Sequence, residues 1–67
     1  MANKLRDYRK AQGMSMSELG RRSRISRMTI WKIENDAPQS YTMRTLQKLA
    51  SALGASVDEI FNINEGR

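Results

Sequence analysis

The residues best suited to bind another molecule lie in one short segment, SRMTIWK, which covers residues 26–32. This segment places Arg27 and Lys32 around Trp31, the single tryptophan of the chain. Cationic side chains bind phosphates and the acceptor atoms of guanine, whereas an aromatic side chain offers apolar contact to base edges, thymine methyl groups or sugars. The segment therefore predicts a surface that contacts nucleic acid, provided that Trp31 is exposed.

The composition favours the same kind of partner. Twelve Lys and Arg residues against seven Asp and Glu residues give a formal net charge of +5 over 67 residues. Such a charge favours a polyanion, with nucleic acid first and an anionic membrane surface second. The chain has no Cys and no His, so we expect no disulfide, no metal and no cofactor. No apolar run resembles a signal peptide or a membrane span, so we expect a soluble, cytoplasmic protein without a membrane partner.

Catalysis has few candidate residues in this chain. Without His or Cys, it would depend on carboxylates, Lys, Tyr or Ser. Glu18 and Glu59 occupy positions that cap helices, and Glu34 has a candidate partner in Arg9. We therefore expect that the protein is not an enzyme.

Capping patterns divide the chain into five short helices, and no alternation typical of strands competes with them. Two patterns are capping boxes, at residues 15–18 and 56–59. Ser26 and Thr42 are candidate caps for two further helices. The expected helices cover residues 3–12, 15–23, 27–35, 42–53 and about two turns after Ser56. The predicted fold is all-α and compact, with one domain over residues 1–67 and a frayed tail at 64–67.

The second and third helices form the pattern of a helix-turn-helix unit over residues 15–35. They are short, capped and separated by three or four residues, and the second of them carries basic side chains. At about 100° per residue, Ile30 and Ile33 define its buried side, and Trp31 lies too far around to share their contacts. We therefore expect Trp31 to be exposed, with packing against helix one or the loop at 36–41 as the alternative.

The other candidates also have purely structural interpretations. Arg27 and Lys32 would then form a solvated basic face, and Met28 would pack against a loop. The three arginines within residues 21–24 are as well suited to general phosphate attraction as to any specific contact.

The spacing of residues along nearly the whole chain resembles that of the Cro/C1-type, or Xre-family, helix-turn-helix domain. The resemblance covers residues 3–61 and rests on Leu5-Arg6-x-x-Arg9, Gly13-Met14-Ser15, Glu18-Leu19-Gly20, Ile25-Ser26, Ile30, Glu34-Asn35, Leu46, Leu49-Ala50, Ala52-Leu53-Gly54 and Ser56-Val57. It implies a five-helix, lambda-repressor-like domain that binds double-stranded DNA. It further implies a bacterial or phage transcriptional regulator, usually a repressor, that binds near-palindromic operators as a homodimer.

The resemblance also implies roles for individual residues. Arg27, Met28 and Lys32 correspond to positions that contact bases in the major groove, and Trp31 lies among them. The residues expected to contact the DNA backbone are Ser15, Met16, Arg24, Ser26 and Arg44. The residues that correspond to an ion pair between helices one and three are Arg9 and Glu34.

Three positions depart from the family pattern. Arg24 replaces the turn glycine, which requires either a different turn or a non-glycine residue at positive φ. Gly20 replaces the usual alanine of helix two, which allows close approach but lowers helix propensity. Asp36 replaces a loop glycine, and the loop after it differs in length and composition, so we expect no DNA contacts from its backbone.

The C-terminal segment suggests a dimer. Val57, Ile60, Phe61 and Ile63 supply more apolar surface than one small core needs, so we expect some of them to face a second copy. The alternative function is an antitoxin-like or adaptor module that binds a protein as well as DNA. Such modules usually carry an extra partner-binding segment, and the sequence ends shortly after the fifth expected helix, which favours the regulator.

Overall fold

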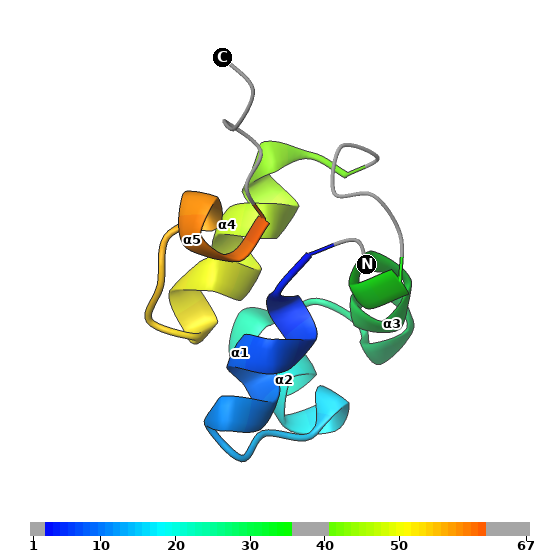
Figure 1. The fold of residues 1–67 in the computed structure, drawn as a ribbon. Coiled ribbons are helices and arrows are strands. Elements are labelled where there is room, and N and C mark those ends of the chain that lie inside the picture. The colour runs from blue at the N-terminus through cyan, green and yellow to red at the C-terminus, as the bar shows by residue number, and fades with distance from the viewer. Residues whose placement is uncertain (1–2, 36–40, 62–67) are drawn as a thin grey trace.

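The computed structural model describes residues 3–35 and 41–61, which form five α-helices (Figure 1). Their bounds are α1 Leu5–Ala11, α2 Met16–Ser23, α3 Arg27–Asn35, α4 Met43–Ala52 and α5 Val57–Phe61. No strand occurs in these two ranges, so the predicted all-α, five-helix fold is confirmed. No helix within the described part combines the length and the apolar character that a membrane span requires. The expected loop at 36–41, apart from Tyr41, and the tail at 64–67 lie outside the described residues.

Hydroxyl side chains cap the starts of four helices. The four side-chain oxygens that accept from a backbone amide three residues ahead are Ser15 Oγ, Ser26 Oγ, Thr42 Oγ1 and Ser56 Oγ. At α5 the capping box is complete, because Glu59 Oε1 accepts from the Ser56 amide at 2.8 Å. At α2 only half of the box forms among the described residues. There the Glu18 carboxylate accepts hydrogen bonds from Arg21 and Arg22 instead.

The first helix is shorter than the sequence predicts, because it begins at Leu5 rather than at residue 3. Asn3 lies before the helix, where its Oδ1 accepts from the Leu5 amide at 2.8 Å. The Nδ2 atom of the same side chain donates to the Ile33 carbonyl, near the end of α3, at 2.8 Å. Asn3 therefore holds the start of one helix and connects it to another.

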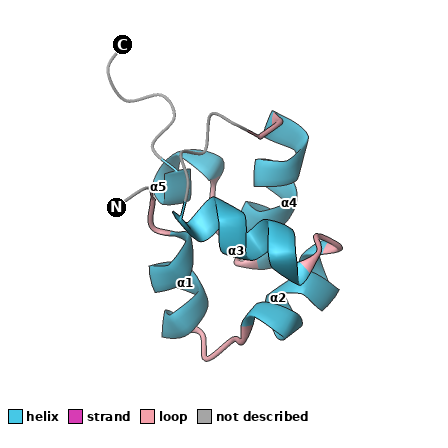
Figure 2. Cartoon of the chain, turned by 90° about the vertical axis from the view of Figure 1, so that its right-hand side faces the viewer, coloured by secondary structure: helices cyan, strands magenta, loops and turns pink. Residues whose placement is uncertain are grey.

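The core lies among all five helices, each of which contributes at least one fully buried side chain. The fully buried large side chains are Leu5, Leu19, Ile30, Ile33, Leu46, Leu49 and Ile60. α2 packs against α3 and α4, α5 packs against α4, and α1 packs against α3 and α5 (Figure 1, Figure 2). The Lys4 amide donates to the Ile60 carbonyl at 2.9 Å, which joins the start of α1 to α5.

The turn between α2 and α3 contains a non-glycine residue in the left-handed region. Arg24 has φ 63° and ψ 30°, and its amide donates to the Gly20 carbonyl at 2.8 Å. The sequence left open whether this turn has a different geometry or a non-glycine residue at positive φ. The second is found, and the positive φ costs about 1–2 kcal/mol for an L-residue. Gly20 itself is required by close approach, since an added Cβ would lie 2.9 Å from the Ile25 carbonyl oxygen.

The sequence predicted that the C-terminal segment has more apolar surface than one small core needs. Two residues of α5 show that this prediction is wrong for them. Ile60 is 0% exposed and Phe61 is 2% exposed in a single copy of the chain, so both belong to the core. They have almost no surface to offer to a second copy. Val57 is half-buried and packs against the core, and Ile63 lies outside the described residues.

Candidate nucleic-acid interface

α3 has one buried side and one exposed side. Ile30 and Ile33 are 0% exposed, whereas Met28 is 68% and Trp31 is 53% exposed. Trp31 is therefore exposed, as helical spacing predicts, and is not a core residue. The four exposed residues expected to contact bases all lie on this helix: Arg27, Met28, Trp31 and Lys32.

A hollow of about 630 Å³ lies between the start of α2 and the first turns of α3. We call it the α2–α3 hollow, and it is lined by Arg9, Ser15, Met16, Ser17, Arg27, Met28 and Trp31. It brings together residues that the sequence assigned separately to base and backbone contacts. Lys32 is not among its lining residues. The sequence did not predict that Arg9 and Ser17 would line the hollow. The position of Ser17 next to Met16, at the start of α2, could have indicated that Ser17 lies there.

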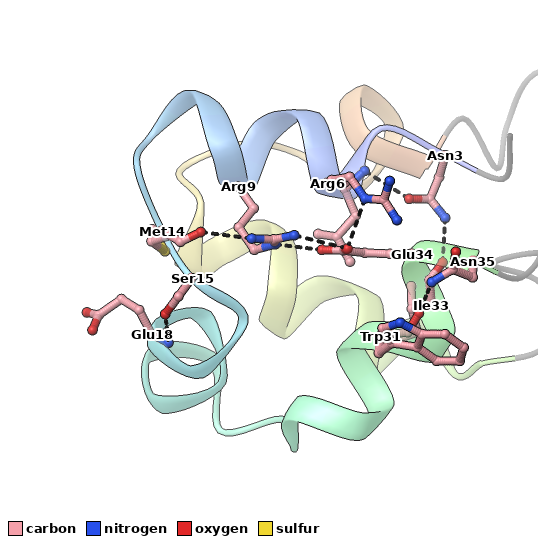
Figure 3. A network of polar contacts seen from close by, with 11 residues as sticks. Asn3, Arg6, Arg9, Met14, Ser15, Glu18, Trp31, Ile33, Glu34 and Asn35 are labelled. Carbon is pink, nitrogen blue, oxygen red and sulfur yellow. Dashed lines mark hydrogen bonds and ion pairs between the residues drawn. The ribbon is translucent and has the colours of Figure 1, made fainter.

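A buried ion pair joins α1 to α3 beside this hollow (Figure 3). The Arg9 guanidinium donates through Nε to Glu34 Oε2 at 2.7 Å and through Nη2 to Glu34 Oε1 at 3.2 Å. Its Nη1 donates to the Met14 carbonyl at 2.9 Å, in the segment that leads into α2. Arg6 adds a longer contact to Glu34, with 3.5 Å between Nε and Oε1. The Arg9 side chain thus connects α1 to α3 and to the segment before α2.

The positive charge of α2 is partly neutralised by Glu18. The carboxylate accepts from Arg21 and from Arg22, whose Nε lies 2.7 Å from Glu18 Oε2. The hydrogen bond from Arg22 holds the pKa of Glu18 below its usual range, with a further contribution from the charge of Arg21. The cations that form no ion pair with any other described residue include Arg24, Arg27, Lys32 and Arg44. Their charge remains available to an anionic partner.

The residues expected to contact the DNA backbone differ in what they can donate. Ser15 Oγ accepts from the Glu18 amide at 3.0 Å, which leaves its hydroxyl proton for an outside acceptor. Met16 has no polar side chain, but it supplies the first backbone amide of α2, and such amides have no acceptor within the helix. Ser26 Oγ accepts from the Thr29 amide at 3.1 Å and donates to Thr29 Oγ1 at 2.9 Å, so its hydroxyl is engaged within α3.

A second hollow, of about 690 Å³, lies between the end of α2 and α4. We call it the basic hollow, because its lining includes Arg22, Arg24, Arg44 and Lys48. It brings together Arg24 and Arg44, both expected to contact the DNA backbone. Lys48 was not expected there, although its position four residues after Arg44 places both on one side of α4. Among the described residues no group of acidic side chains is arranged to hold a metal ion.

Comparison with known proteins agrees with this architecture. The model of the helix-turn-helix family matches residues 5–60. The chain therefore belongs to the Cro/C1-type helix-turn-helix family, which confirms the resemblance found in the sequence. The helix-turn-helix unit that defines this family is a DNA-binding fold, and α2 and α3 form that unit here.

A solved structure has the same fold. One chain of a complex between the SinR protein and the SinI protein superposes with a TM-score of 0.79 over 92% of this chain, at 24% sequence identity. This chain spans 60% of that one, and at this identity the likeness concerns the fold alone. No curated protein matches the sequence.

Proposed function

We propose that the protein is a sequence-specific transcriptional regulator that binds near-palindromic operators in double-stranded DNA as a homodimer and represses transcription. The observation that carries the proposal is α3, whose exposed side presents Arg27, Met28, Trp31 and Lys32 while its opposite side is buried in the core. The major groove of B-DNA is wide enough to admit one α-helix, and it presents a different set of groups for each base pair. A helix of this kind is suited to insertion in that groove.

Base contacts and backbone contacts come from different residues in this proposal. Arg27 is the first residue of α3, and its guanidinium can donate two hydrogen bonds to O6 and N7 of guanine. Lys32 lies further along the helix, where it reaches a base or a phosphate. Contacts to phosphate come from Ser15 and the first amides of α2, and from Arg24 and Arg44 in the basic hollow. Phosphate contacts fix the position of α3 in the groove.

We propose that the dimer contact lies on α4 and α5. Because Ile60 and Phe61 are buried in a single copy, the contact would use other side chains of these two helices. Met43, which is 46% exposed, and the half-buried Ala55 and Val57 line a groove between α4 and α5 of about 410 Å³. The groove is also lined by Gln47, Ser51, Ser56 and Asp58. A surface of mixed apolar and polar residues supports a symmetric contact in which each copy presents the same residues. The two copies of α3 would then lie about 34 Å apart, one turn of DNA.

Repression is the direct consequence of such binding, because an occupied operator is closed to other proteins. The protein would act in the cytoplasm of a bacterium, encoded by the cell or by a phage. It would use neither a cofactor nor a metal, and it would have no enzymatic activity.

The proposal is tested by selecting duplexes from a random pool with the purified protein and mapping the protected bases of the selected duplex. We expect one enriched near-palindrome whose half-sites are separated by about one helical turn. Recovery of unrelated sequences would contradict specific binding. Protection of a single asymmetric half-site at saturation would contradict the dimer.

The dimer surface has its own test and a matched control. Val57→Asp places a charge in the α4–α5 groove and should weaken binding to the full operator while leaving binding to an isolated half-site nearly unchanged. Ala11→Asp changes the net charge equally at an exposed position of α1, away from the groove. Its effect should be small and equal on the two duplexes, like the effect of Val57→Asp on the isolated half-site. Equal behaviour of the two variants would contradict a contact at Val57.

A second candidate function is a module that binds a protein partner as well as DNA, as antitoxin-like and adaptor proteins do. The observation that favours it is the same α4–α5 groove, which fits a different chain as well as a second copy. SinR, which has a similar fold, is found in a complex with SinI. Light scattering of the purified protein separates the two candidates. A dimer in the absence of other proteins supports self-association, whereas a monomer that remains monomeric on operator DNA favours the module.

A further inference from the structure

We infer that the α2–α3 hollow receives the methyl groups of thymine, and that the operator must therefore carry thymine at a fixed position in each half-site. The inference rests on the proposed function, because it assumes that α3 enters the major groove. It adds a base preference that the basic side chains alone do not supply. It also assigns a role to the two exposed apolar side chains of α3.

The apolar surface of the hollow comes from both helices of the helix-turn-helix unit. Met16 belongs to α2, whereas Met28 and Trp31 belong to α3 and are 68% and 53% exposed. Large apolar side chains at such exposure favour a surface that another molecule covers. Arg27 lines the same hollow and forms no ion pair with another described residue. An apolar surface beside an unpaired cation fits a partner that is anionic overall and apolar at one point.

The major-groove edges of the bases supply one such apolar point. Guanine presents N7 and O6, adenine presents N7 and its amino group, and cytosine presents its amino group. Thymine presents O4 and the C5 methyl group. Covering a polar edge with methionine and tryptophan side chains removes water without replacing its hydrogen bonds, which is unfavourable. Covering a methyl group is favourable, so the hollow should prefer thymine over the other three bases.

The size of the preference follows from the area of one methyl group. Removing one such group from water contributes enough free energy for an affinity difference of roughly fourfold. The hollow, at about 630 Å³, is larger than a single methyl group and can accept the methyl groups of adjacent thymines. Met16 and Met28 are unbranched and flexible, so they can close around groups of different position.

The experiment removes the methyl group alone. Each thymine of the selected duplex is replaced, one at a time, by deoxyuridine, which keeps the same base pairing and lacks the C5 methyl. Affinity is measured by fluorescence anisotropy for the unaltered protein and for Met28→Ala, with Met43→Ala as the matched control. Met43 is also exposed, at 46%, but it lies on α4 in the groove of the proposed dimer contact and does not line the hollow. Met43→Ala should therefore lower affinity for every duplex alike, without changing the effect of deoxyuridine.

For the unaltered protein, we expect at least one thymine per half-site whose replacement lowers affinity by about fourfold or more. Met28→Ala should bind more weakly and lose most of this dependence on the methyl group, whereas Met43→Ala should retain it. Because Met28 is largely exposed, its replacement should leave the melting temperature nearly unchanged. Trp31→Ala is the second variant, and it should also reduce the dependence.

Other outcomes separate the inference from the proposed function. Specific binding to a duplex that tolerates deoxyuridine at every position would overturn the inference and leave the function intact, with the hollow then available to another partner. A methyl dependence that Met28→Ala and Trp31→Ala both retain would place the thymine contact elsewhere and would also overturn it. Absence of any sequence preference would instead refute the proposed function.

Discussion

Trp31 and Ile30 are adjacent in the sequence and have opposite environments, with exposures of 53% and 0%. Trp31→Ala removes a ring from the surface, so we expect the melting temperature to change little. Affinity for the operator should fall by about tenfold, as for a central aromatic contact. Thermal denaturation and a binding isotherm on the same variant measure both effects.

Ile30→Ala is the control for this residue, because it removes a fully buried side chain from the same helix. It should cost about 2–5 kcal/mol of folding free energy, a large share of the stability of a small domain. A comparable loss of stability in Trp31→Ala would contradict the exposed placement of the ring.

The ion pair of Arg9 and Glu34 carries the second prediction at this scale. Their side chains are 8% and 0% exposed, so Glu34→Gln leaves a buried guanidinium without a countercharge. We expect a loss of about 3 kcal/mol in the free energy of unfolding, measured by denaturant titration. The selected operator sequence should not change.

Arg6→Ala is the control for the ion pair. The Arg6 side chain is 51% exposed and lies 3.5 Å from Glu34, so its removal should cost less than about 1 kcal/mol. If Glu34→Gln melted like the unaltered protein and selected a different operator, Glu34 would have a role in recognition rather than in the fold.

At the scale of elements, the bounds of α2 and α3 follow from local signals. Ser15 and Ser26 each accept a hydrogen bond from the backbone amide three residues further along the chain, and such contacts depend only on the local sequence. The start of α1 could not be predicted in this way. Asn3 donates to the Ile33 carbonyl, 30 positions further along the chain, and it therefore lies outside the helix that its spacing predicted.

The turn between α2 and α3 provides a prediction about helix packing. Gly20→Ala raises helix propensity by about 1 kcal/mol. It also places a Cβ 2.9 Å from the Ile25 carbonyl oxygen, which is a backbone atom and cannot move by rotation of a side chain. We expect a net loss of about 1–2 kcal/mol in stability, measured by thermal denaturation, because the turn must shift.

Ser17→Ala is the matched control for this substitution. Ser17 is an exposed residue of the same helix, so the change supplies the gain in helix propensity without a close contact. It should leave stability unchanged or slightly higher. If Gly20→Ala proved as stable as Ser17→Ala, the two helices would be further apart at this turn than the structure shows.

At the scale of the whole molecule, the assembly of the candidate site depends on contacts between distant elements. The sequence singled out Arg27, Met28 and Trp31, because helical spacing separates them from the core. It did not predict that Arg9 would line the α2–α3 hollow, since this requires knowing how α1 lies against α3. Nor did it predict the burial of Phe61, because spacing alone does not distinguish a core side chain from one that covers a partner.

The distribution of charge over the molecule predicts how DNA affinity depends on salt. Arg44 lies in the first turn of α4, in the basic hollow and away from the α2–α3 hollow. Arg44→Ala should weaken binding to the operator and to a random duplex about equally. It should also reduce the slope of log affinity against log salt concentration by about one unit. Unequal losses on the two duplexes would contradict a phosphate contact.

The central claim is that the exposed side of α3 specifies the operator, and Arg27→Ala tests it most directly. The measurement is the ratio of affinities for the selected operator and for a random duplex, compared between this variant and the unaltered protein at one salt concentration. The account predicts a loss of about 1–3 kcal/mol on the operator and little loss on the random duplex, so that the ratio falls. An unchanged ratio, with both duplexes weakened equally, would show that Arg27 contacts only phosphate and would contradict the claim.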